Sequence, residues 1–182
     1  MIEGEALVLP PEAAAAAKGF LRVERADEDG LIAALVGAAA ELCEGFTGQA
    51  LLARSFSETM PASRAWQRLS RTPVRAIVSV EALPAEGAAL ALASGTYAID
   101  IDSNGDGWVR LTAPIEARRI RVGYEAGVAG DWESLPAALR HGIVRLAAHL
   151  YSSRGAEGGR LADLPPASVT ALWRPWRRMR LR

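Results

Sequence analysis

DEDGLIAALVGAAAELCEGFTG, residues 27–48, is the stretch that decides the fold. Its three acidic residues stand where a helix begins, because carboxylates cap the first turn and complement the helix dipole. Its apolar residues then recur at intervals of three and four, which predicts a helix with one apolar face. We expect the helix to end at Thr47-Gly48, since glycine readily forms a C-terminal stop. The apolar positions are Leu31, Ile32, Leu35, Val36, Ala39, Leu42, Cys43 and Phe46.

After this helix the pattern changes to short runs of strand type separated by turns. Helical spacing returns at Ser134-Leu135-Pro136, a capping serine with a proline in the first turn, and continues to Tyr151. This order predicts an α+β fold, in which a helical bundle core carries a β-rich insertion between the N-terminal helix and the C-terminal helices. The predicted strands are Ser55–Met60, Ala65–Leu69, Ala76–Leu83, Thr96–Asp102, Gly107–Leu111 and Arg118–Tyr124.

The chain divides by composition into four consecutive segments, which we expect to form one structural unit. Residues 1–50 are an extended arm, a short alanine-rich helical turn and the helix quoted above. Residues 51–130 are the β-rich insertion, and residues 131–160 are the core helix and a glycine-rich linker. Residues 161–182 contain a short helix after Pro165-Pro166 and a basic, aromatic tail.

Composition excludes several classes of protein. The chain has 182 residues and 21 basic against 21 acidic side chains, so it is neither a disordered tail nor a general polyanion binder. Cys43 is the single cysteine, which excludes a disulfide framework within one chain. No apolar run approaches the roughly 20 residues of a membrane span, and no signal peptide is recognisable at the start. We expect the protein to be made in the cytoplasm.

The sharpest local motif is Asp102-Ser103-Asn104-Gly105-Asp106-Gly107, which matches the first half of a calcium-binding loop. The twelfth position of that loop should be a bidentate glutamate, but it is Ala113 here. The flanking residues alternate as strands do, and Asn-Gly and Asp-Gly pairs favour tight turns. The motif therefore predicts a β-hairpin, with a calcium site as the lesser alternative.

Catalytic chemistry finds little support in the sequence. His141 and His149 are the only histidines, and on one helix they lie about 12 Å apart, too far to share a metal. No phosphate-binding glycine loop and no nucleophile elbow is present. A hydrolase that uses Asp100, Asp102 and Asp106 around a metal is the least favoured alternative. We predict that the protein is not an enzyme and has no catalytic, cofactor or metal site.

The C-terminal tail contains five arginines and two tryptophans in the last ten residues. Both residue types are enriched at binding hot spots. Three interpretations stay open: the indoles pack back on the same subunit, the tail docks on a protein partner, or it contacts nucleic acid phosphates. The candidate docking residues are Trp173, Arg174, Trp176, Arg177, Arg178 and Arg180.

Several motifs in this order resemble one known family. The acidic start at Asp27 and a helix that ends Glu44-Gly45-Phe46-Thr47-Gly48-Gln49-Ala50-Leu51 resemble the opening of head-tail connector (adaptor) proteins of tailed phages. Further motifs resemble the long members with a β insertion, which include the adaptor of bacterial gene transfer agent particles. The likeness runs from Leu21 to Trp176, and these further motifs are Pro73-Val74, Val78-Ser79-Val80, Tyr124-Glu125-Ala126-Gly127, Leu135-Pro136-Ala137-Ala138-Leu139-Arg140 and His149-Leu150-Tyr151 with Arg154.

The resemblance implies a virion structural protein that forms a twelve-subunit ring beneath the portal. Such a ring extends the DNA channel, lets double-stranded DNA pass without sequence-specific binding, and receives a stopper or tail-terminator protein. It implies that the C-terminal tail docks on the portal, and that the protein moves from the cytoplasm of the producing bacterium to the neck of the particle. Arg140, Arg145 and Arg154 beside the apolar stripe of the core helix are candidates for the ring interface. The alternatives are another neck or tail completion protein, and a DNA-binding protein that uses the tail.

Overall fold

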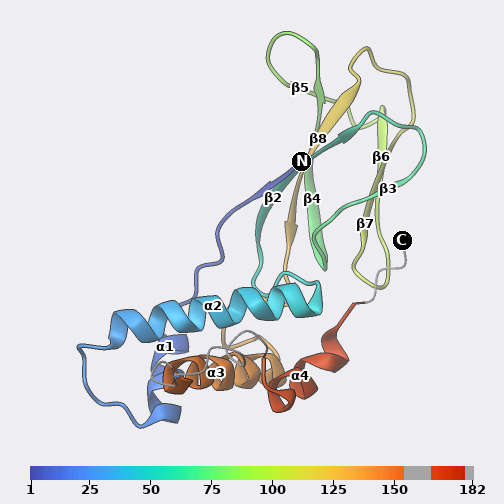
Figure 1. Ribbon diagram of the computed structural model, residues 1–182. Coiled ribbons are helices and arrows are strands. Elements are labelled where there is room, and N and C mark those ends of the chain that lie inside the picture. Colours follow the sequence, from blue (N-terminus) through green and yellow to red (C-terminus); the bar gives the residue numbers. More distant parts are fainter. Residues whose placement is uncertain (154–164, 179–182) are drawn as a thin grey trace. The chain divides into compact units, whose positions relative to one another are not determined.

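The structure is a computed structural model of the 182-residue chain, and it describes residues 1–153 and 165–178 (Figure 1). The chain divides into two compact units: Met1–Ala6 with Leu52–Val128, and Leu7–Leu51 with Ala129–Arg182. The first contains the strands and the second the helices, here called the β unit and the helical unit. Four α-helices and two antiparallel sheets lie within the described residues, which confirms the α+β class. The segment 1–50 contributes to both units.

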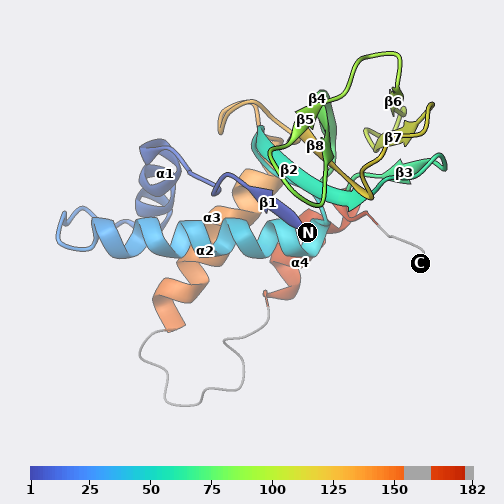
Figure 2. The ribbon, with the colours of Figure 1, turned by 90° about the horizontal axis from the view of Figure 1, so that it is seen from above.

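The helical unit is built around two long helices that pack on each other (Figure 2). The shorter α1 packs against both of them, and α4 packs mainly on α3. The first three helices lie where the sequence predicts them, although α1 is longer than the single turn expected. The elements are α1 (Pro11–Leu21), α2 (Asp29–Thr47), α3 (Ala137–Ser152), α4 (Ala167–Trp173) and the 3-10 turn η2 (Arg174–Trp176).

The buried face of α2 is narrower than the predicted apolar stripe. Ile32, Val36 and Cys43 are fully buried, but Leu31 is 39% exposed and Leu42 is 45% exposed. Burial raises the pKa of the Cys43 thiol, which fits its role as a small core residue. At the end of α2, Gly48 adopts φ 70° and donates its N–H to the Glu44 carbonyl oxygen at 2.8 Å. The predicted glycine stop is therefore confirmed.

α2 is long and apolar enough to cross a membrane by length and composition alone, although the sequence predicts no membrane span. Less than half of that stretch is buried within the structure. Core helices of globular proteins also meet this criterion, and α2 packs against α1, α3 and α4. Unlike most core helices, α2 also leaves large apolar side chains exposed, namely Leu31 and Leu42.

Two predicted side-chain caps are wrong. Glu28 precedes α2 without a capping hydrogen bond, and its carboxylate instead accepts a hydrogen bond from the Tyr151 hydroxyl. Ser134 does not cap α3, since Pro136 holds that position. The Ser134 N–H donates to Asp131 Oδ1 at 2.8 Å, and the two residues close a turn before the helix. A turn that precedes the helix satisfies these groups locally, so the serine is not needed at the cap.

This turn supports a prediction about pH. Hydrogen bonds from the Ser134 backbone and hydroxyl lower the pKa of Asp131, an exposed carboxyl. A carboxyl whose pKa is lowered in the folded state stabilises the fold above its unfolded pKa, and this contribution is lost as pH falls through the folded value. We expect Ser134→Ala to raise the pKa of Asp131, because the hydroxyl, one of the groups that lower it, is lost. Carboxyl-carbon NMR titration measures this directly, and an unchanged midpoint would show that the hydroxyl contributes nothing.

The β unit contains a five-stranded sheet of order β1-β2-β8-β4-β5 and a three-stranded sheet of order β3-β7-β6. All strand pairs are antiparallel. The six strands predicted from the sequence are present, and two short edge strands, β1 and β5, were not predicted. The strands are β1 (Ile2–Gly4), β2 (Arg54–Pro61), β3 (Gln67–Arg68), β4 (Val74–Leu83), β5 (Leu90–Ala91), β6 (Tyr97–Ile101), β7 (Gly107–Leu111) and β8 (Arg119–Ala126).

A buried polar cluster ties the middle of the larger sheet to the following loop. Glu58 on β2 is only 9% exposed, and its carboxylate accepts the Ser70 N–H at 2.8 Å and the Tyr124 hydroxyl at 3.1 Å. Tyr124 stacks on Phe56 with 5.7 Å between ring centroids. Burial raises the pKa of Tyr124, so the phenol stays a hydrogen-bond donor. The carboxylate is therefore compensated by donors inside the fold and does not need an external ligand.

The motif at Asp102 forms the predicted β-hairpin between β6 and β7, with Ile101 opposite Gly107. Gly105 adopts φ 75°, which glycine tolerates at no steric cost. The Asp102 carboxylate accepts the N–H groups of Asn104 and Asp106 at 2.8 and 3.0 Å and the Trp108 indole N–H at 3.2 Å. The Asp102 carboxylate oxygens therefore accept hydrogen bonds from within the hairpin itself. Among the described residues, no group of three or more His, Cys, Asp or Glu side chains is placed to hold a metal ion.

Candidate docking surfaces

Trp173 is a core residue of the helical unit and has no exposed surface. Its indole lies against α3 at Gly142, and its Nε1–H donates to the Leu139 carbonyl oxygen at 3.4 Å. A Cβ at position 142 would lie 2.1 Å from Nε1, so only glycine leaves room for the indole. The Phe46 ring of α2 also packs against the indole, with 5.9 Å between ring centroids. Of the three interpretations of the tail, Trp173 takes the first, packing on its own subunit.

The rest of the described tail is held at the C-terminal end of α2. The Trp176 carbonyl oxygen accepts a hydrogen bond from the Gln49 side chain at 2.5 Å. The Arg178 N–H donates to the Thr47 carbonyl oxygen at 2.9 Å. The Arg177 guanidinium lies 5.5 Å from the centre of the Phe46 ring. The tail thus follows a defined path as far as residue 178 and is not a free segment there.

These contacts define which docking candidates are available to a partner. Arg174 and Arg177 are exposed, while Trp176 and Arg178 are half-buried. We call these four residues the tail surface. Arg180, also a docking candidate, lies outside the described residues.

Two of the three ring-interface candidates, Arg140 and Arg145, belong to α3. Arg140 pairs with Glu133 at 2.7 Å, and Arg145 donates to the Ser168 hydroxyl at 3.4 Å. Both side chains are half-buried. Arg154, the third candidate, lies outside the described residues. Arg140 and Arg145 are five residues apart, so their side chains leave α3 in different directions, and the structure does not bring them into one polar site.

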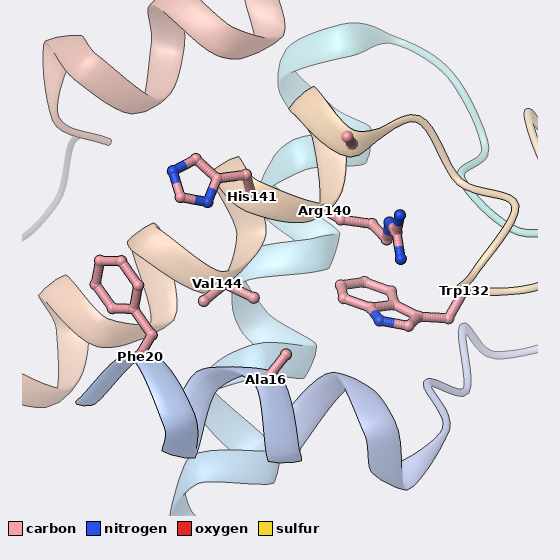
Figure 3. A pocket seen from close by; sticks show the side chains of 7 residues that line it. Ala16, Phe20, Trp132, Arg140, His141 and Val144 are labelled. Carbon is pink, nitrogen blue, oxygen red and sulfur yellow. The ribbon is translucent and has the colours of Figure 1, made fainter. Parts of the chain in front are cut away.

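Two shallow grooves border α3, and Phe20 of α1 lies between them. The first, of about 390 Å³, is lined by Phe20, Trp132, Arg140 and His141 among others (Figure 3). The second, of about 330 Å³, is lined by Phe20, Arg145 and His149 among others. Figure 3 shows Phe20 and His141 at one end of the first groove and Arg140 and Trp132 at the other. The second groove also contains Ser152, Ser168 and His149. The Ser152 hydroxyl donates to the Ala148 carbonyl oxygen at 3.0 Å, and the Ser168 hydroxyl accepts a hydrogen bond from Arg145.

Phe20 is the residue that the sequence-based search for sites missed. Its ring is 51% exposed and meets the His141 ring edge to face, with centroids 6.2 Å apart. Single exposed apolar side chains are common on protein surfaces, but Phe20 borders both grooves, which makes this side of α3 a candidate contact surface. Its position near the end of the alanine-rich α1, directly after Lys18-Gly19, was the only signal in the sequence.

Comparison with known proteins gives matches among solved structures only. No family model matches the chain, and no curated protein matches it. A chain from the neck of an empty gene transfer agent (GTA) particle, solved with C6 symmetry, superposes with a TM-score of 0.79 at 25% identity. A chain from the virion of a native GTA particle gives 0.75 at 26% identity, and one from the neck of a native GTA particle solved with C12 symmetry gives 0.74 at 24%. Each alignment covers 100% of this chain and 97% of the other.

The chain has the fold of a GTA neck protein. The family resemblance inferred from its motifs is thereby confirmed at the level of the whole chain. The likeness to GTA neck and virion chains includes the helical unit and the β unit alike, since no part of this chain is left unaligned. The neighbours are components of virions, and none is described as an enzyme.

Proposed function

We propose that this protein is a head-tail connector (adaptor) subunit that forms a ring beneath the portal of a gene transfer agent or tailed phage. The observation that carries the proposal is the full-length likeness to GTA neck and virion chains at 25% and 26% identity. A ring of twelve copies agrees with the C6 and C12 symmetries of the two necks, because twelve is compatible with both. The ring extends the DNA channel and joins head to tail.

The partners follow from the position in the neck. The tail surface, with the exposed guanidinium groups of Arg174 and Arg177, docks on the portal. The opposite side of the ring receives a stopper or tail-terminator protein. DNA passes through without being held, which a chain of balanced charge allows because it releases few counterions from the phosphates. Assembly takes place in the cytoplasm of the producing bacterium, and the protein ends in the neck.

Deleting the gene and imaging the particles tests this function. We expect filled heads and free tails that are not joined, and complementation with the intact gene should restore joined particles. Portal protein should co-purify with the tagged chain, and tail tube protein should not. Normal joined particles in the deletion strain would refute the proposal, and co-purification with tail tube alone would favour a tail completion protein.

Variants of the tail surface test the portal contact separately. Arg174→Glu with Arg177→Glu reverses two exposed charges, so we expect portal co-purification to fall by at least about tenfold. Arg75→Glu, an exposed arginine of β4 in the β unit, is the matched control and should bind as the parent protein does. Equal binding by all three proteins would exclude the tail surface as the portal contact.

A further inference from the structure

We propose that neighbouring copies in the ring join through the exposed face of α2 on one copy and the exposed face of α3 on the next. The inference rests on the proposed ring and names the two surfaces that form it. The α2 face consists of Leu31, Ala34, Ala38, Glu41 and Leu42. The α3 face consists of His141, Arg145 and His149 together with Phe20 of α1.

The two exposed faces carry opposite charge. On the α2 face the charged residue is Glu41, whereas Asp29 of the same helix pairs with Lys18 of α1. On the α3 face the charged residue is Arg145, whereas Arg140 of the same helix pairs with Glu133. A surface that bears a single sign of charge repels a copy of itself and attracts the other surface. The charges therefore favour α2 against α3 and disfavour α2 against α2.

Apolar side chains supply the contact area on both faces. Leu31 and Leu42 lie eleven residues apart on α2, about 16 Å along the axis, with Ala34 and Ala38 exposed between them. On the other face, Phe20 rises between two shallow grooves beside a row of residues at spacing four, His141, Arg145 and His149. A row of small residues flanked by leucines accepts a protruding aromatic ring. In this pairing the exposed apolar residues of α2 are covered by Phe20 and the α3 face of the next copy.

The geometry of the unit allows a closed ring. α2 and α3 cross and pack on each other (Figure 2). Because each helix turns its buried residues toward the other, their exposed residues lie on different sides of the pair. One copy can therefore offer α2 to one neighbour and α3 to the other. Such a head-to-tail interface is heterologous, and it generates a ring when the rotation closes.

Charge reversal and rescue test the pairing. Glu41→Arg and Arg145→Glu should each reduce ring formation at least about tenfold, because each places like charges together. The double variant restores opposite charges and should recover most of the ring population. Native mass spectrometry of the purified full-length chain, together with neck occupancy in complemented particles, measures the ring. Circular dichroism verifies that each variant is folded.

Apolar variants provide a second, independent test. Leu42→Asp should prevent the ring, since it places a carboxylate in the apolar contact. Leu90→Asp on β5 is the matched control, because Leu90 is also exposed but lies in the β unit. Rings that persist in Leu42→Asp and in both single charge variants would overturn this pairing and leave the connector function standing. The absence of rings from the parent protein, both in solution and in particles, would overturn the connector function as well.

Discussion

Trp173→Ala should lower the free energy of unfolding by about 3–5 kcal/mol, the usual cost of removing a large aromatic side chain from a core. The indole is fully buried between Gly142 of α3 and Phe46 of α2, and its N–H is hydrogen-bonded. Position 142, directly beside the indole, has no side chain that could fill the space. Urea unfolding followed at 222 nm, which reports mainly the helices, measures the loss.

Trp176→Ala is the matched control for this prediction. Trp176 lies three residues further along the same tail but is only half-buried, and its link to Gln49 uses the backbone carbonyl oxygen. We therefore expect a loss of about 1 kcal/mol. Equal losses for both variants would show that Trp173 is no more part of the core than Trp176.

Gly127→Ala should destabilise the β unit by about 3 kcal/mol, near the upper end of the usual range for overpacking. A Cβ at this position would lie 2.3 Å from the Ala53 backbone nitrogen and 2.5 Å from the Leu52 carbonyl carbon. These are main-chain atoms, which cannot turn aside as a flexible side chain can. The substitution therefore forces β2 and the end of β8 apart. Hydrogen exchange of the β2 and β8 amides should show faster opening.

Gly37→Ala, the same chemical change in α2, should have the opposite sign. No heavy atom outside the helix backbone lies within 4 Å of the position where its Cβ would stand. Alanine in a helix interior is more stable than glycine by about 0.5–1 kcal/mol. A stabilised Gly127→Ala protein, or one that matches Gly37→Ala, would contradict the close approach at residue 127.

The regular elements could be predicted because their periods are long and clear. α2 and α3 each repeat apolar residues over more than a dozen positions, and β2, β4, β7 and β8 alternate over five or more. β1 and β5 were missed because strands of three and two residues have no period to detect. The caps at Glu28 and Ser134 were wrong for two reasons: Glu28 makes a long-range hydrogen bond with Tyr151, and Ser134 makes a local one with Asp131.

The candidate surfaces were harder to predict because exposure is a tertiary property. Five arginines and two tryptophans marked the tail, but composition could not tell that Trp173 is buried and Arg174 is not. One signal was present in the sequence: Gly142 interrupts a good helix, and a glycine inside a helix often marks the close approach of another group. Phe20 and the exposed side of α2 could be assigned only once the packing of α1, α2 and α3 was known.

The buried position of Trp173 would also make binding of a partner to the tail surface depend on folding. Arg174 directly follows this core residue, and the Phe46 ring contacts both the Trp173 indole and the Arg177 guanidinium, so both cations take their positions only after α2, α3 and α4 have come together. A partner that reads these two cations would reject an immature copy, because the cations would then have no fixed spacing. Under this arrangement only folded copies would enter the assembly, and no chaperone would be needed to select them, since the packing of the subunit's own core sets the spacing of the two cations.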